Sequence, residues 1–240
     1  DDQEQHEELG ARNAKHARQY KRARVRGRRP ARDLGQWGRA APGRPSAARG
    51  GAHFEEGAPM SADKTLSWSY TEEFPIEPEA AMQARLRGIE LGTAPVTPAT
   101  GAALRMLAAS VAARSVAEIG TGTGVSGLWI LDGMGPDGVL TTIDVEPEIQ
   151  REARRAFESG GRARSRTRVI RGRASDVLPR MAARSYDMVV LDVEPEESAA
   201  LIDQALRMLR VGGVLAVTRA LWNDHVADPA RRDPATVAAR

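Results

Sequence analysis

The sequence contains no cysteine, and this absence excludes several kinds of protein at once. Disulfide scaffolds, zinc sites built from thiolates, iron–sulfur clusters and cysteine nucleophiles all need that residue. The chain also has no run of about 18 apolar residues and no signal-peptide pattern at its start, so we expect a cytoplasmic protein without a membrane partner. Aromatic residues make up only 4% of the chain, which disfavours a stacking platform for single-stranded nucleic acid.

The chain does contain enough apolar sequence for a sizeable core. Of its 240 residues, 41% are apolar and 28% are charged, which suits one α/β domain with an appendage or two small domains. The formal net charge of +3 is unevenly distributed. Residues 1–59 carry 13 Lys and Arg against 8 Asp and Glu, whereas residues 60–240 carry 22 against 24. The excess of positive charge therefore belongs to the first quarter of the chain.

Residues 1–59 are rich in Arg, Gly, Pro and Ala and have no sustained apolar period, so we expect a disordered extension there. Three interpretations stay open: an arm that contacts nucleic-acid phosphates, an ordinary disordered tail, or a segment that is not part of the native protein. We favour the third, because Met60 opens a segment of different composition. In addition, residues 55–57 (Glu-Glu-Gly) lie just before Met60. They are what a purine-rich ribosome-binding sequence upstream of a start codon would encode if it were translated in frame. The predicted domain is therefore residues 60–240.

Hydrophobic patterning predicts an α/β fold for that domain. Two helices come first, at residues 77–89 and 99–113, and the loop between them is rich in Gly and Pro. Strands follow at residues 115–119, 139–143, 168–171, 187–191 and 213–218. Helices alternate with them at residues 125–131, 147–159, 175–183, 197–209 and 234–240.

The predicted strands are nearly continuous apolar runs, which is typical of strands covered on both faces. Together with the strand–helix alternation they indicate a doubly wound, mostly parallel sheet. Within the domain we expect N-terminal helices and a lid at residues 65–113, and a Rossmann-like core at residues 114–240.

A glycine-rich turn joins the first strand to the next helix, where residues 118–124 read Glu-Ile-Gly-Thr-Gly-Thr-Gly. Glycine lets the backbone turn tightly and approach a ligand, although many α/β sheets use such a turn only for packing. The dinucleotide pattern G-x-G-x-x-G does not fit, because Val125 occupies its last glycine position. Asp144 ends the second strand, where a carboxylate can accept both hydroxyls of a ribose. With Glu118 nearby, the turn favours a cationic nucleoside over a pyrophosphate.

These motifs resemble the class I S-adenosylmethionine-dependent methyltransferases, and among them the small O-methyltransferases of the catechol and caffeoyl-CoA type. The resemblance covers roughly residues 65–230. Besides the glycine-rich turn, it rests on four further motifs: TIDVEP at 142–147, RGRASDVLP at 171–179, VVLD at 189–192 and VGGVL at 211–215.

The resemblance implies a binding site for S-adenosylmethionine with a role for each matching position. Glu118, the Gly120–Thr121–Gly122 backbone and Ser126 would hold the methionine part. Asp144 would hold the ribose, Val145 and Ala174 would lie at the adenine, Val96 would contact the cofactor from the lid, and Asp192 would point into the reaction cleft.

Structural explanations compete with several of these roles. Ser126 could be a first-turn helix residue that bonds a free N–H group, and Ala174 could simply allow close packing. Trp129 is better explained as a core residue than as a cofactor-stacking one. Glu194 and Glu196 fit the solvated start of a helix better than a catalytic pair.

The sequence departs from the family at the metal site. Members hold a divalent cation with an Asp after the fourth strand, present here as Asp192, and with an Asp-Asn pair after the fifth. Thr218-Arg219 stands in place of that pair, and one carboxylate is too few for a Mg²⁺ or Ca²⁺ site. Asn223-Asp224 could substitute only if their loop folds back. We therefore expect no metal site and a metal-independent reaction.

The family's lysine base is also missing, and Pro195 lies near its place. The candidate bases are Asp192, Glu194 and His225, the only histidine after Met60. Family members carry two more strands after the fifth strand–helix unit, whereas this sequence ends at Arg240 inside a predicted helix. We therefore expect those C-terminal strands to be missing.

The leading hypothesis is an O-methyltransferase that acts on a hydroxyl of a small, aromatic acceptor. The alternative is a truncated or non-catalytic relative that binds the cofactor, and a nucleic-acid-associated methyltransferase is supported only by the arginine-rich tail. The helix predicted at 77–89 has an apolar face of Ala81, Met82, Leu86 and Ile89, and an apolar-rich stretch at residues 66–76 precedes it. Together they predict a homodimer, unless the run folds as a lid over its own cleft.

Overall fold

The computed structural model describes residues 62–240, with side chains from Leu66 onward except that of Glu73, so the predicted extension at 1–59 lies outside the described residues. The strands are β1 (Ser115–Ile119), β2 (Val139–Asp144), β3 (Thr167–Arg171), β4 (Tyr186–Leu191) and β5 (Leu209–Val217). The α-helices are α2 (Ala62–Glu73), α3 (Glu79–Glu90), α4 (Pro98–Ser110), α5 (Val125–Gly133), α6 (Pro147–Ser159), α7 (Ala174–Val177), α8 (Pro195–Met208) and α9 (Pro234–Ala239). Three short 3₁₀ turns are η1 (Arg164–Arg166), η2 (Leu178–Arg180) and η3 (His225–Ala227).

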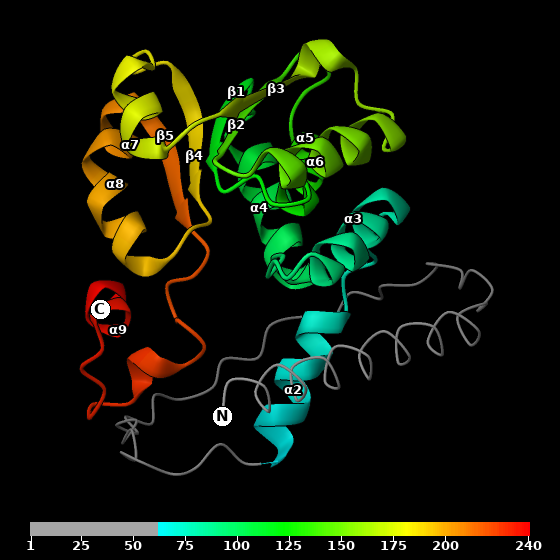
Figure 1. Cartoon of the computed structure of the whole chain (residues 1–240). Helices are drawn as coiled ribbons and strands as arrows, with labels where there is room; N and C mark the ends of the chain where they lie inside the picture. The colour runs from blue at the N-terminus through cyan, green and yellow to red at the C-terminus, as the bar shows by residue number, and fades with distance from the viewer. Residues whose placement is uncertain (1–61) are drawn as a thin grey trace, which may run out of the picture. The chain divides into compact units, whose positions relative to one another are not determined.

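The described strands form one parallel sheet in the order β3-β2-β1-β4-β5. Helices α4, α5 and α6 lie on one side of it and α7 and α8 on the other (Figure 1). The reversal of strand order beside β1 is a topological switch point, where open α/β sheets bind ligands beyond the carboxyl ends of the strands. The doubly wound fold predicted from the sequence is confirmed.

Each face of the sheet has its own hydrophobic core because side chains alternate along every strand. In β4, Met188 and Val190 pack with α4 and α5, whereas Val189 and Leu191 pack with α8. Burying both sets explains why the sequence of the strand is apolar without interruption. The sheet is therefore rigid where its carboxyl ends present polar residues.

Helices α4 and α5 approach each other closely at a glycine. A Cβ placed on Gly101 would lie 2.4 Å from the Cδ1 atom of Trp129. The Trp129 side chain is 1% exposed, so the structural explanation of this residue as part of the core is correct. This packing fixes α5, which begins directly after the glycine-rich turn.

Three elements differ from the sequence-based expectation. The helix predicted at 175–183 is limited to α7 and the following turn η2, because Pro179 has no N–H group and cannot donate a helical hydrogen bond. Strand β5 begins four residues earlier than predicted. Helix α2 was not predicted, because its exposed apolar side chains follow no helical period.

A carboxylate joins three strands at the amino end of the sheet, opposite the switch point. Asp187 accepts hydrogen bonds from the backbone N–H groups of Arg114 (2.7 Å) and Ser115 (2.9 Å), and it pairs with the Arg210 guanidinium at 2.6 Å. Burial raises the pKa of Asp187, but the hydrogen bonds from Arg210 and the two N–H groups outweigh it and lower the pKa overall. The ionised form of Asp187 therefore stabilises the fold.

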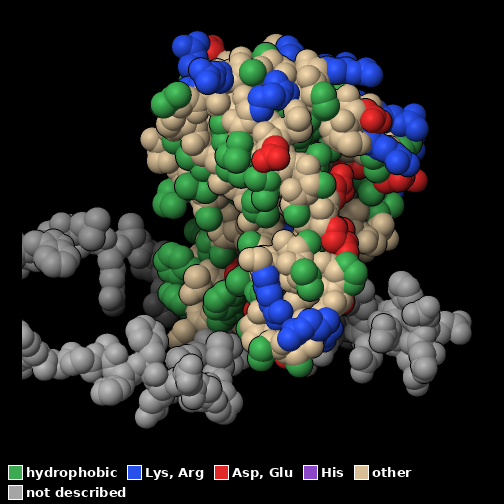
Figure 2. Space-filling model, turned by 90° about the vertical axis from the view of Figure 1, so that its left-hand side faces the viewer, with side chains coloured by type: hydrophobic (Ala, Val, Ile, Leu, Met, Phe, Trp, Pro, Cys, Tyr) green, Lys and Arg blue, Asp and Glu red, His purple; other side chains and the backbone are tan. Residues whose placement is uncertain are grey.

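The side of the molecule that carries α7 and α8 is mixed in character. Figure 2 shows hydrophobic side chains scattered over it and Lys and Arg side chains gathered along its upper margin. Ile202 and Leu206 of α8 are among the exposed hydrophobic residues, as is Val211 of β5. Within residues 62–240, none of the helices combines the length and the apolar character needed to span a bilayer.

Candidate functional site

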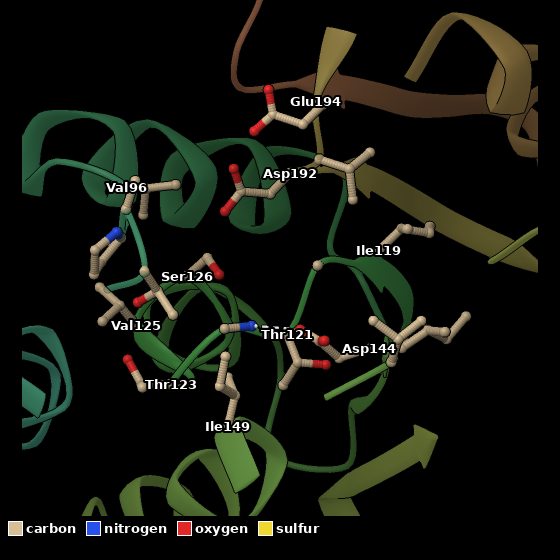
Figure 3. Close-up of a pocket in the computed structure, with 18 of the residues that line it drawn as sticks. Val96, Ile119, Thr121, Thr123, Val125, Ser126, Asp144, Ile149, Asp192 and Glu194 are labelled. Carbon is tan, nitrogen blue, oxygen red and sulfur yellow. Dashed lines mark hydrogen bonds between the residues drawn. The ribbon is translucent and has the colours of Figure 1, made fainter. Parts of the chain in front are cut away.

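A cavity of about 400 Å³ lies beyond the carboxyl ends of β1, β2 and β4, at the switch point. Its size is in the range of small-molecule sites. Figure 3 shows Val96 on the side opposite Asp144, with Asp192 and Glu194 above them. The lining comes from six segments: Gly92–Val96, Ile119–Thr123 with Val125 and Ser126, Ile143–Val145 with Ile149, Gly172 with Ala174, Asp192–Glu194 with Glu197, and Arg219.

Glycine is required at the turn that forms the floor of the cavity. Gly120 and Gly122 have φ of 93° and 48°, in the left-handed region that other residues rarely adopt. A Cβ on Gly120 would lie 2.2 Å from the carbonyl oxygen of Asp192, so β1 and β4 can approach only with glycine there. The Thr123 hydroxyl donates to the carbonyl of Ala84 at 2.7 Å, which ties the turn to α3.

Asp144 is fixed at the end of β2 by the backbone around it. Its Oδ2 accepts from the N–H of Gly122 at 3.1 Å, and its Oδ1 accepts from the N–H of Glu146 at 3.0 Å. Gln150 donates to the carbonyls of Asp144 and Ile170, which holds the end of β2 against β3. The carboxylate keeps lone pairs free and lines the cavity.

Four more of the residues predicted from the sequence line the same cavity. Val145 is half exposed directly after Asp144, and Ala174 is buried at the start of α7. Val96 is buried in the loop between α3 and α4, and Ser126 is buried in the first turn of α5. All four line the cavity, so the structure brings together elements that are distant in sequence.

Glu118 is completely buried and is not among the residues that line the cavity, although the next residue, Ile119, is. Its Oε2 accepts from the Thr142 hydroxyl at 2.6 Å, and its Oε1 has no hydrogen-bond partner. Burial raises the pKa of Glu118 to about 7; the hydroxyls of Ser126 and Thr142 oppose the rise, and the charges of Asp192 and Asp144 add to it. A buried carboxylate with an unsatisfied oxygen is stabilised by an adjacent cation.

The opposite end of the cavity holds an ion pair between the ends of β4 and β5. Oδ1 of Asp192 accepts from the Thr218 hydroxyl at 2.6 Å and lies 3.2 Å from Nε of Arg219. The same guanidinium donates from Nη2 to the carbonyl of Ala94 at 3.1 Å, and its Nη1 is 3.9 Å from Oε1 of Glu194. Burial raises the pKa of Asp192, whereas Thr218 and Arg219 act to lower it.

These residues do not fit a divalent cation. Among residues 62–240, no group of three or more His, Cys, Asp or Glu is arranged to hold a metal ion. Asn223, Asp224 and His225 are not among the residues that line the cavity, so the structure does not bring the alternative ligands or this candidate base to Asp192. The His225 ring instead lies edge-on to Trp222, with ring centroids 6.4 Å apart.

Sequence reasoning missed two lining residues that bear on chemistry. Glu197 lines the cavity from the first turn of α8, and Thr93 lines it from the loop before Val96. The acidic run after Asp192 was a signal for Glu197. No pattern in the sequence distinguished Thr93, whose buried hydroxyl has no partner.

A family model described as O-methyltransferase matches residues 80–239, which include every element that lines the cavity. The chain belongs to the O-methyltransferase family. A relative from Mycobacterium ulcerans, which its name assigns to the O-methyltransferases, is 46% identical over 184 residues, 77% of this chain and 82% of the relative. The family identified from the sequence motifs is thereby confirmed.

Solved structures of similar proteins share the fold, and one of the two described here is an O-methyltransferase. A Corynebacterium glutamicum protein is 35% identical with a TM-score of 0.67, covering 73% of this chain and 83% of its own. The O-methyltransferase TomG from Streptomyces achromogenes, which takes part in tomaymycin synthesis and was crystallised with S-adenosylmethionine, is 28% identical with a TM-score of 0.65. That match covers 73% of this chain and 81% of TomG.

Proposed function

We propose that this O-methyltransferase binds S-adenosylmethionine in the cavity and transfers its methyl group to a hydroxyl of a small aromatic acceptor. The observation that carries the proposal is the unpartnered Oε1 of fully buried Glu118, behind a glycine-rich turn. The cofactor has an ammonium and a sulfonium, and this half of the cavity is lined by carboxylate rather than by cationic side chains. Family membership and the complex of TomG with S-adenosylmethionine support the same cofactor.

The residues present fit the parts of this cofactor. The buried charge of Glu118, next to the lining residue Ile119, would stabilise the ammonium, and the backbone of the turn would receive the carboxylate. Asp144 would accept the two ribose hydroxyls, since Gly122 and Glu146 already orient its oxygens. The remaining roles fall to residues that also line the cavity: Val145 and Ala174 at the adenine, Val96 from the lid side, and Thr121, Ser126 and Asp192 near the methionine part.

The bound cofactor supplies a methyl group on a positively charged sulfur, so the chain's task is to bind and align the acceptor. Positioning alone can account for much of the acceleration of such a transfer. Asp192, Glu194 and Arg219 line the cavity where β4 and β5 end and would surround the acceptor hydroxyl. Burial of Asp192 and its bonds to Thr218 and Arg219 keep it in one orientation.

We further propose that the reaction needs no divalent metal. The support is the ion pair itself: a hydrogen bond from Thr218 and the guanidinium of Arg219 already engage Oδ1 of Asp192. Asp192 and Glu194 are the candidate bases that line the cavity.

The test combines binding and turnover on the full chain. Calorimetry with S-adenosylhomocysteine should show one site, and a screen over phenols and catechols should yield methyl ethers. Addition of EDTA should leave the rate unchanged; loss of activity that Mg²⁺ restores would refute metal independence. Cofactor binding without transfer to any hydroxyl compound would favour the non-catalytic alternative.

We also propose a homodimer formed through residues 66–76. Their apolar side chains stay exposed in the chain: Leu66, Trp68, Tyr70, Phe74 and Ile76. None of them is among the residues that line the cavity, which supports an interface rather than a lid. Sedimentation of the full chain should show a dimer that Trp68→Glu with Ile76→Glu converts to a monomer; a wild-type monomer at tens of micromolar would refute this interface. Cytoplasmic location stays a prediction.

A further inference from the structure

Arg219 is the only cationic side chain among the described residues that line the cavity. It directly follows β5 and Thr218, at the end of the cavity where the acceptor is proposed to bind. Its side chain is 27% exposed, so it is neither buried in the core nor free in solvent. Arg219 lies among the carboxylates of Asp192, Glu194 and Glu197, and we ask whether it does more than neutralise one of them.

The guanidinium of Arg219 is fixed by two contacts and has one nitrogen left over. Nε is held at 3.2 Å from Oδ1 of Asp192, and Nη2 donates to the carbonyl of Ala94 at 3.1 Å. The remaining nitrogen, Nη1, lies 3.9 Å from Oε1 of Glu194, which is beyond hydrogen-bond distance. Glu194 is 56% exposed and therefore well solvated, so it leaves Nη1 able to bind another acceptor atom.

Fixed N–H donors on a permanent cation stabilise an oxygen that gains negative charge. They need no reorganisation when the charge develops, because the guanidinium is already oriented by Asp192 and Ala94. A cation beside a hydroxyl also lowers its pKa, since it favours the ionised form. Among hydroxyl compounds, phenols ionise most readily and gain most from such a partner.

We propose that Nη1 of Arg219 binds the reacting oxygen of the acceptor as its anion, which selects acceptors with an acidic, phenolic hydroxyl. This inference rests on the proposed function of the same cavity. The acceptor loses its hydroxyl proton to solvent, and a lone pair of its oxygen forms the new C–O bond. The bond between the methyl carbon and sulfur breaks with its electron pair left on sulfur, which gives a methyl ether and S-adenosylhomocysteine. Glu194, at the rim, is displaced from Nη1 when the anion binds.

The experiment titrates a phenol bound to the protein and needs no turnover. 4-Nitrophenol changes its absorption on ionisation, so its pKa can be measured in the presence of the full chain and S-adenosylhomocysteine. We expect the wild-type protein to lower the pKa of the bound probe by at least one unit, Arg219→Lys to retain part of that effect and Arg219→Gln to abolish it. Arg180→Gln, an exposed arginine away from the cavity, is the matched control and should behave as wild type.

A second measurement separates acceptor binding from a purely structural role. Arg219→Gln should lower kcat at least tenfold for weakly acidic phenols and much less for nitrophenols, whereas its affinity for S-adenosylhomocysteine should stay within about twofold of wild type. An equal loss for all phenols, or a lost affinity for S-adenosylhomocysteine, would mean that Arg219 only holds Ala94 and the loop, and would overturn the inference.

The outcomes for the two proposals remain distinct. If no phenol is methylated but the bound probe has a lowered pKa that depends on Arg219, the proposed function fails and the anion site stands. If phenols are methylated but the probe binds with an unchanged pKa, or does not bind, the inference about Arg219 fails. Arg219→Lys keeps the ion pair with Asp192 possible, so it provides the test even if Arg219→Gln does not fold.

Discussion

Replacing Glu118 with Gln should stabilise the ligand-free protein and weaken its binding of the cofactor product. The carboxyl is fully buried, and burial raises its pKa from 4.5 to about 7. Because the folded-state pKa is the higher one, the stabilising contribution of the protonated form is complete below about pH 4.5 and is lost as the pH rises through 7. Glutamine keeps the shape and can still accept the Thr142 hydrogen bond, but it never becomes charged.

The magnitude follows from the difference between the two pKa values. It corresponds to roughly 3 kcal/mol in total, of which roughly 2–3 kcal/mol falls between pH 5 and pH 8. The free energy of unfolding of Glu118→Gln should therefore rise relative to wild type by that amount across this range. Binding of S-adenosylhomocysteine at pH 8 should weaken by about 1.5–3 kcal/mol, because a charge-assisted hydrogen bond to the ammonium is lost.

Urea unfolding at several pH values measures the first effect, and calorimetry measures the second. The control is Glu148→Gln, which removes a carboxylate that is 62% exposed and should give curves parallel to wild type. The wild-type affinity for S-adenosylhomocysteine should increase from pH 6 to pH 8, and that of Glu118→Gln should stay flat. Parallel stability curves for Glu118→Gln and wild type, or equal affinities at pH 8, would refute the reasoning.

Three further predictions concern single residues. Asp144→Ala should weaken binding of S-adenosylhomocysteine by about 1.5–3 kcal/mol in calorimetry, and an unchanged affinity would show that the ribose lies elsewhere. Asp187→Asn should destabilise the fold by about 1–3 kcal/mol at pH 7. Because its folded-state pKa is lowered, that difference should shrink as the pH falls below about 4, and a difference that persists in acid would contradict it. Gly101→Ala should lower stability by about 1–3 kcal/mol, since its Cβ would overlap Trp129, whereas Gly135→Ala meets nothing within 4 Å and serves as the control.

The fold could be predicted from the sequence because the apolar runs of single strands and the strand–helix alternation along the chain both indicate a parallel sheet. Apolar runs, breakers and the glycine-rich turn located the strands to within a few residues, and Asp144 followed from its place after β2. The predicted helix at 175–183 extended too far, because Pro179 cannot donate the hydrogen bond that would continue α7. Helix α2 was missed, since no apolar stripe marks it.

The candidate site was only partly predictable for a different reason. Residues beside strand ends converge by topology, so Glu118, Asp144 and Asp192 could be placed together from order alone. The contact of Arg219 with Ala94 depends on how two loops 125 residues apart meet, which no periodicity encodes. Sequence comparison with the family showed only that Arg219 was an unusual residue at that position.

The span of that contact has a consequence for the order of folding. The residues of the cofactor half, from Gly92 to Ala174, are separated by at most 82 positions, whereas Arg219 joins Asp192 and Ala94 across 27 and 125 positions. Closing a long loop costs more conformational entropy than closing a short one. Contacts between residues far apart in the sequence are therefore expected to form later than local contacts. We therefore expect the part of the cavity lined by Arg219 to be completed only after β5 has paired with β4. If Arg219 contacts the acceptor as proposed, we expect methyl transfer to require the finished sheet, because β5 carries Arg219 to Asp192 and Ala94.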